Sequence, residues 1–150
     1  MIVYLDSSSI VSVHLEETSR HLHVRQAIES AERTATVALA YVEVRAALAR
    51  ARFREAPPRL DADTYPRAVA DFERDWAGYF RLNVTGGLIA SAASLAEKHR
   101  LRAYDAVHLA CAVLLKADGL PEGLALSTWD LNLAEAARAE GLALAHEVTS

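Results

Sequence analysis

The sequence predicts an α/β protein in which helices cover both faces of a parallel sheet. Short apolar runs alternate with longer segments of helical spacing along the chain of 150 residues. Capping or turn residues such as Gly, Pro, Asp, Ser and Thr stand between most of these segments. Parallel strands need long crossover connections, usually helical, so this alternation favours a parallel sheet over hairpins.

The first strand is expected at residues 2–5, an apolar run that the polar residues 6–9 bring to an end. Aspartate and serine are good N-cap residues, so this polar group also predicts the start of a helix. A second helix is expected over residues 20–32, where apolar side chains recur every three or four positions and Thr18-Ser19 offers an N-cap.

A second strand over residues 34–37 is expected to lead into a long helix over residues 39–54, rich in Ala, Leu and Arg. Pro57-Pro58 ends that helix. Another helix is predicted over residues 64–78, because Thr-Tyr-Pro forms a good helix start. Its buried face is expected to be an apolar stripe at helical spacing: Val69, Phe72 and Trp76.

The second half of the chain predicts three more strands and three more helices. In chain order they are a strand at 79–84, helices at 88–99 and 103–117, a strand at 124–127, a helix from Asn132 closed by Gly141, and a strand at 142–148. Thr85-Gly86-Gly87 breaks the third strand, and residues 118–121 form a turn. Asn132 and Glu135 have the spacing of a capping box. No linker or repeat divides the chain, so we expect residues 1–150 to form one domain.

The composition points to an ordinary globular protein of the cytoplasm. Hydrophobic residues make up 52% and charged residues 24%, and no apolar run approaches the length of a membrane span. The N-terminus lacks the features of a secretory signal. Cys111 is the only cysteine, which excludes an intrachain disulfide and fits a reducing compartment.

The charge pattern leaves room for a local contact with nucleic acid. The net charge of −4 argues against binding through the overall field of the protein. Of the 16 cationic residues, however, only Lys98 and Lys116 are lysine, and arginine is suited to bidentate phosphate contacts. Arginines also cluster on the helix over residues 39–54 and just after it, either as solvated surface or as an RNA-contacting track; the candidate contacts are Arg45, Arg50 and Arg52.

Four acidic residues are expected to meet at one edge of the sheet. Asp6 follows the first strand directly, and Asp130 lies three residues beyond the fourth. Glu43 and Asp105 sit in the first turns of helices that start at the same edge. Each acid taken alone has an ordinary structural explanation, such as an N-cap or a favourable position on a helix dipole. The set is different, because ligands of open α/β sheets bind beyond the carboxyl ends of the strands.

Converging carboxylates repel one another, so the edge needs a compensating positive charge. No lysine lies near any of the four acids in sequence, and the nearest arginines are Arg45 and Arg102. A hard divalent cation such as Mg²⁺ is the other solution, and it suits phosphodiester hydrolysis. His108 shares a helical face with Asp105 and would be a base or a ligand, but its apolar neighbours favour a structural, hydrogen-bonded histidine. The remaining histidines lack zinc-site spacing.

Four blocks of sequence, YLDSSSIV, YVEVRAALARA, LRAYDAVHLACAV and LSTWD, resemble in order and spacing the PIN-domain ribonucleases of VapC type. These are the toxin halves of bacterial and archaeal toxin–antitoxin pairs. The resemblance implies a three-layer α/β/α sandwich with a central parallel sheet of about five strands. It also implies a Mg²⁺- or Mn²⁺-dependent endoribonuclease, in which Asp6, Glu43, Asp105 and Asp130 hold the metal and Thr128 supports them.

The same resemblance implies partners. Family members cleave structured RNA, commonly form homodimers, and are silenced by an antitoxin protein whose tail enters the acidic groove, often with an arginine. One departure concerns the lysine that the family frequently has soon after the first acid, where this chain has Ser12-Val13-His14. A substrate contact through that lysine is therefore not expected here.

Three other functions compete with this interpretation. A catalytically silent PIN-like module that binds RNA or protein is the main alternative. A phosphatase with an aspartate nucleophile resembles a DxDx pattern, but position 8 is serine. A response-regulator receiver needs a lysine after its fifth strand, and no lysine follows Lys116.

Overall fold

A computed structural model describes residues 1–16, 19–120 and 123–148 and contains a parallel sheet of five strands. The strands are β1 (Ile2–Leu5), β2 (Arg33–Val37), β3 (Phe80–Leu82), β4 (Leu124–Ser127) and β5 (Ala143–Leu144). The helices are α1 (Ser7–His14), α2 (Arg20–Ser30), α3 (Ala40–Phe53), α4 (Thr64–Gly78), α5 (Gly86–His99), α6 (Ala103–Ala117) and α7 (Leu131–Ala139).

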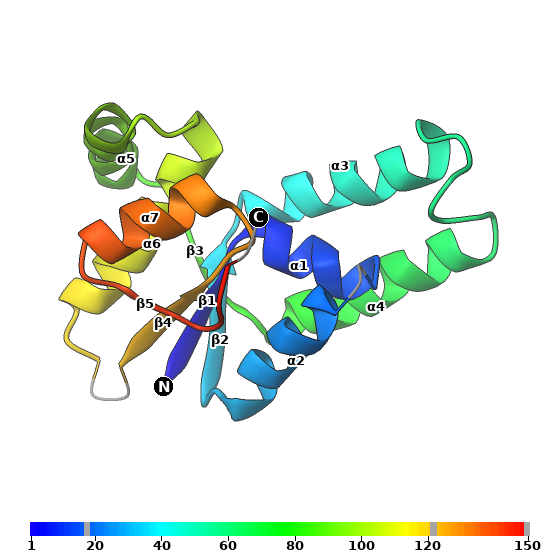
Figure 1. The fold of residues 1–150 in the computed structure, drawn as a ribbon, viewed down its shortest axis with the longest axis horizontal. Coiled ribbons are helices and arrows are strands. Elements are labelled where there is room, and N and C mark those ends of the chain that lie inside the picture. The colour runs from blue at the N-terminus through cyan, green and yellow to red at the C-terminus, as the bar shows by residue number, and fades with distance from the viewer. Residues whose placement is uncertain (17–18, 121–122, 149–150) are drawn as a thin grey trace.

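The helices form two layers on opposite faces of the sheet. Helices α1 to α4 lie on one face, whereas α5, α6 and α7 lie on the other (Figure 1). The hairpin of α3 and α4 extends beyond the sheet as an arm (Figure 1). This arrangement confirms the predicted α/β/α sandwich and the parallel sheet of about five strands.

Strand β1 is the centre of the sheet and of the core. The strand order is β3-β2-β1-β4-β5, so β1 pairs on both sides, with Tyr4 opposite Ala35 of β2 and Leu126 of β4. Every residue of β1 is buried, because helices cover both faces. A parallel strand that is buried on both faces has a continuous run of apolar residues. This explains why residues 2–5 could be recognised as a strand in the sequence.

The order of the strands places a topological switch point between β1 and β4. The chain moves from β1 outward through β2 and β3, and then returns to the other side of β1 through β4 and β5. The backbone N–H of Asp6 donates to the carbonyl of Ser127 at 3.1 Å, which locks the ends of β1 and β4 together. The crevice at such a point is where doubly wound folds bind ligands.

Helix α6 is the most buried helix on the second face. The stretch from Ala106 to Ala112 is buried without a break, and the helix packs on β2 and β4. Because its apolar side chains are held by both strands, its first turn is fixed at the carboxyl edge of the sheet. No helix in the described part of the chain combines the length and apolar character needed to cross a bilayer.

The structure departs from the predicted boundaries in several places. Strand β5 has only two residues rather than the predicted 142–148, since it is an edge strand that pairs with β4 alone. Helix α5 begins at Gly86, because the Thr85 hydroxyl accepts from the Leu88 N–H at 3.1 Å and so caps the helix two residues early. Strand β3 is likewise shorter than predicted.

The start of α7 also differs from the prediction. Asp130, not Asn132, is the N-cap, and its carboxylate accepts from the Leu133 N–H at 2.8 Å. The backbone is extended at Asp130 and helical from the next residue, so the predicted capping box does not form. The predicted cap residue Thr18 and turn residue Pro121 lie outside the described residues.

We predict that α6 depends on its buried apolar face. Leu109→Ala, at a position with no exposed surface, should lower the free energy of unfolding by about 2–5 kcal/mol, measured by urea denaturation. Leu114→Ala in the same helix is the matched control, because Leu114 is 48% exposed and its loss should change stability by no more than about 0.5 kcal/mol. Equal losses for the two variants would contradict this account of α6.

Candidate metal centre

Asp6 stands directly after β1 and is held through both of its carboxylate oxygens. Oδ1 accepts from the Ser9 N–H at 2.9 Å and from the Ser8 hydroxyl at 2.7 Å, so Asp6 is the N-cap of α1. Oδ2 accepts from the Thr128 hydroxyl at 2.5 Å. Asp6 is only 2% exposed. These three hydrogen-bond donors therefore fix the direction of a buried carboxylate at the switch point.

The segment after β4 is tied to Asp6 through Thr128. The backbone N–H of Asp130 donates to the Thr128 hydroxyl at 3.0 Å, and the N–H of Trp129 donates to Ser8 at 3.0 Å. Because Asp130 also caps α7 through Oδ1, Oδ2 is the oxygen that faces the acidic edge. The Thr128 hydroxyl therefore lies between Asp6 and the backbone of Asp130 and joins the ends of β1 and β4.

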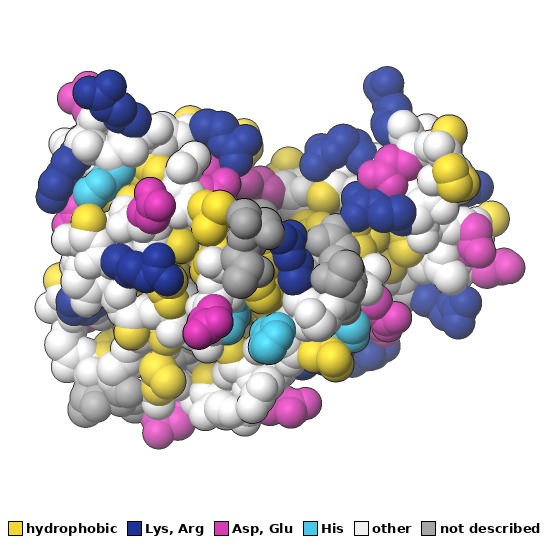
Figure 2. Space-filling view, in the orientation of Figure 1, with side chains coloured by type: hydrophobic (Ala, Val, Ile, Leu, Met, Phe, Trp, Pro, Cys, Tyr) yellow, Lys and Arg dark blue, Asp and Glu magenta, His cyan; other side chains and the backbone are white. Residues whose placement is uncertain are grey.

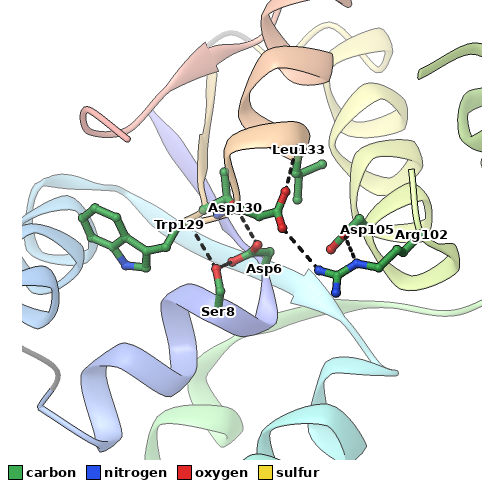
Figure 3. Close-up of polar contacts among 8 residues, drawn as sticks. Asp6, Ser8, Arg102, Asp105, Trp129, Asp130 and Leu133 are labelled. Atoms are coloured by element: carbon green, nitrogen blue, oxygen red, sulfur yellow. Dashed lines mark hydrogen bonds and ion pairs between the residues drawn. The ribbon is translucent and has the colours of Figure 1, made fainter. Parts of the chain in front are cut away.

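Asp105 reaches the same edge from the first turn of α6, and an arginine lies between it and Asp130. Arg102 donates from Nε to Asp105 Oδ2 at 3.3 Å and from Nη2 to Asp130 Oδ2 at 3.3 Å. Figure 3 shows its guanidinium between the two carboxylates, with Asp6 nearby. The three aspartates that sequence reasoning assigned to this edge are therefore brought together.

The electrostatic environment of Asp105 is unfavourable to its charge. Burial raises the pKa of Asp105, and the negative charges of Asp130 and Asp6 raise it further. The charge and hydrogen bond of Arg102 lower that pKa, but they do not cancel the other effects. The negative charge of this edge is thus only partly offset by Arg102, which is the condition that favours cation binding.

Glu43 lies in the first turn of α3 and is joined to the core through His108. Its Oε1 is 2.9 Å from Nε2 of His108, which also contacts the Ser7 hydroxyl at 3.1 Å. On the other side of the ring, Nδ1 is 2.9 Å from the Tyr4 hydroxyl. With His108 only 2% exposed and bonded through both ring nitrogens, the structure favours the structural, hydrogen-bonded role for it.

The contacts of Glu43 lower its pKa, whereas the surroundings of Asp105 raise the pKa of that residue. Burial alone would raise the pKa of Glu43, but the hydrogen bond and charge of His108 and the hydrogen bond of Ser7 outweigh it, so the pKa lies below its usual value. Glu43 is therefore an anion at neutral pH with its orientation set by α6 and β1. Sequence reasoning did not identify Ser7 and Tyr4 as its supports, since nothing in their spacing links them to residue 43.

The donor chemistry of the edge fits a hard divalent cation, although the side chains are not arranged as a finished coordination shell. Within residues 1–16, 19–120 and 123–148, no three Asp, Glu, His or Cys side chains form a group that could hold a metal ion as they stand. Each acid is instead turned toward a partner within the chain: Asp6 to Thr128, Glu43 to His108, and Asp105 and Asp130 to Arg102. Carboxylate oxygens are the ligands that Mg²⁺ and Mn²⁺ prefer.

The three arginines predicted to contact RNA lie on α3, in the arm, and their side chains differ in how they are held. Arg45 is held by Glu73 of α4 at 2.8 Å and by the Tyr41 hydroxyl at 3.0 Å, so it fastens α4 to α3. Arg52 lies over the ring of Phe53, and Arg50 is exposed.

In the space-filling view, a notch separates the arm from the body of α5 to α7, with acidic side chains at its base and Lys or Arg side chains on both walls (Figure 2).

Arg102 is the residue that sequence reasoning placed near the acids without assigning it a contact. Its spacing of three residues from Asp105 was the available signal, since such pairs are neighbours on a helix surface. Its side chain is 82% exposed, although it touches two carboxylates that are 17% and 24% exposed.

Comparison with known proteins yields one family and two sets of relatives. A PIN domain model matches residues 3–139. Two curated proteins of Mycobacterium tuberculosis, Ribonuclease VapC45 of strain CDC 1551 and Ribonuclease VapC49 of strain H37Rv, are each 35% identical over 148 residues. Each alignment covers 96% of this chain and 94% of the relative.

Two solved structures share the fold at lower identity. A toxin-antitoxin complex from Klebsiella pneumoniae contains a chain with a TM-score of 0.64 and 17% identity, covering 97% of this chain and 99% of that one. The FitAcB structure from Neisseria gonorrhoeae contains one with a TM-score of 0.60 and 18% identity, covering 96% of each chain. At these identities the match establishes the fold.

We predict that removing the Asp105 charge stabilises the metal-free protein. A raised pKa means that ionisation of Asp105 opposes folding, so the penalty is absent below the ordinary pKa of aspartate and complete above the raised one. Asp105→Asn should therefore increase the free energy of unfolding in EDTA at neutral pH by on the order of 1 kcal/mol. The gain should disappear as the pH falls below about 4. Urea denaturation at several pH values measures it, and a variant less stable than the wild type at pH 7 would contradict the expected repulsion.

Proposed function

The chain belongs to the PIN-domain family, and on that premise we propose that it is a metal-dependent endoribonuclease and the toxin of a toxin–antitoxin pair. The proposal takes residues 1–150 as a single PIN domain that hydrolyses phosphodiester bonds in structured RNA. The observation that carries it is the meeting of Asp6, Asp105 and Asp130 at the topological switch point, with a negative charge that Arg102 only partly offsets. The two ribonuclease relatives support the reaction class.

Asp6 and Asp105 are the proposed principal metal ligands, with Glu43 binding directly or through water and Asp130 as an outer ligand or water-orienting group. When bound, Mg²⁺ or Mn²⁺ supplies Lewis-acid activation of the phosphate and of water. The protein itself supplies orientation, which is worth most when the ligands are held rigidly. Thr128 and the start of α1 orient Asp6, whereas His108 and Ser7 orient Glu43.

The partners follow from the same edge. We propose a cognate antitoxin protein that inserts a segment with an arginine into the acidic groove, because a guanidinium already fits between Asp105 and Asp130 in this chain. We also propose a homodimer, for which the exposed apolar side chains of Ile89 and Tyr104 at the starts of α5 and α6 are candidate contacts. An RNA substrate implies action in the cytoplasm.

Metal-dependent RNA cleavage should depend on Asp105. Purified protein with Mg²⁺ or Mn²⁺ should cleave RNA, and Asp105→Asn should lower the rate at least about 100-fold by removing a charged ligand, as measured by gel analysis of labelled RNA. Asp71→Asn is the matched control, because Asp71 forms a surface ion pair with Arg74 on α4. Activity that persists in Asp105→Asn would overturn the assignment. Binding of RNA without cleavage by the folded wild type would favour the silent binding module.

Metal should also stabilise the fold. At tenfold excess over its dissociation constant, Mg²⁺ or Mn²⁺ should add about 1.4 kcal/mol to the free energy of unfolding and raise the melting temperature in a thermal shift assay. Asp6→Asn should lose this increase, although asparagine caps a helix as well as aspartate does, so that α1 remains capped. A melting temperature that does not respond to millimolar metal in the wild type would count against a site at this edge.

A further inference from the structure

We propose that Arg102 is an exchangeable cation of the active edge: it occupies Asp105 and Asp130 when metal is absent and binds an RNA phosphate when metal is present. The proposal rests on the proposed ribonuclease function. It assigns to Arg102 both a competition with metal and a contact with substrate.

The first step is the position of the guanidinium. Its two donors face two carboxylates from different elements, Asp105 in the first turn of α6 and Asp130 at the N-cap of α7. The acceptor atom is Oδ2 in both cases, and Oδ1 of Asp130 is already committed to the cap of α7. The oxygen of Asp130 available to a metal is therefore one that Arg102 occupies. Figure 3 shows the guanidinium at this oxygen. A cation that takes the same place beside Asp130 Oδ2 would compete with Arg102 for it.

The second step is how weakly Arg102 is held. Both contacts are 3.3 Å long, whereas charge-assisted hydrogen bonds of this kind are commonly about 2.7–2.9 Å. The side chain is 82% exposed and makes no cap contact with its own helix. The Asp130 carboxylate, in contrast, is fixed by its cap of α7, and Asp105 stands in the first turn of α6. The guanidinium can thus move into solvent while the cap contact of Asp130 stays in place.

The third step is where Arg102 goes. Its backbone is the N-cap of α6, three residues before Asp105, so a displaced side chain stays beside the acidic edge. A phosphate that approaches a metal held by Asp105 would lie within reach of that side chain, and the planar guanidinium suits bidentate phosphate binding. Arg45, the predicted RNA contact nearest to Glu43 in sequence, is instead engaged by Glu73. Among the described residues, Arg102 is the only arginine with a recorded contact to Asp105 or Asp130.

The test compares Arg102→Gln with Arg138→Gln, which removes the same charge from the exposed C-terminal end of α7, about 12 Å from Asp130 along the helix. Isothermal titration with Mn²⁺ in the absence of RNA measures the competition. Arg102→Gln should bind Mn²⁺ about three- to tenfold more tightly than the wild type, because no side chain has to be displaced. Arg138→Gln should bind Mn²⁺ like the wild type.

Steady-state cleavage at saturating Mn²⁺ measures the phosphate contact. Arg102→Gln should raise KM for RNA about tenfold or more, with a smaller effect on kcat, and Arg102→Lys should recover part of this loss by restoring the charge. Equal Mn²⁺ affinities in the wild type and Arg102→Gln would overturn the competition, and an unchanged KM would overturn the phosphate contact. A wild type that binds no Mn²⁺ would contradict the proposed ribonuclease function together with this inference.

Discussion

The structure depends on one electrostatic constraint, which is that the backbone forces like charges together before any ligand is present. The N–H of Asp6 is bonded to the end of β4, and the first turn of α6 is held by the strands beneath it. The backbone positions of the aspartates at these points are therefore fixed by the sheet and by the packing of α6. Their mutual repulsion lowers the stability of the fold, and the apolar core must offset that loss. Such a loss is common where a functional site holds charged groups close together.

The hydrogen bonds around the edge explain how the fold tolerates that constraint. Asp6 is satisfied by Ser8, Ser9 and Thr128, and Glu43 by His108, so two of the four charges have neutral or imidazole donors. Asp105 and Asp130 share one exposed arginine. The edge therefore has two parts. Asp6 and Glu43 are held in place by hydrogen bonds within the protein, whereas Asp105 and Asp130 share an arginine that a cation could replace.

Much of this could be predicted from the sequence, because the acids follow strand ends and helix starts that have clear local signals. The apolar run of residues 2–5 fixes the place of Asp6, and the long apolar helix fixes that of Asp105. The bonds of His108 to Tyr4 and Glu43, and the direction of Arg102, arise only from tertiary packing between residues far apart in the chain. The short β5 and the cap at Asp130 were missed for a related reason, since edge pairing and backbone angles decide them.

Anomalous scattering from crystals soaked in Mn²⁺ tests the central claim most directly, because it locates the cation without relying on activity. The account predicts a peak between Asp6, Asp105 and Asp130, about 2.1 Å from carboxylate oxygens, with the Arg102 guanidinium displaced from both of its acceptors. A fully soaked crystal with no peak at this edge, or with Arg102 still seated between Asp105 and Asp130, would contradict it.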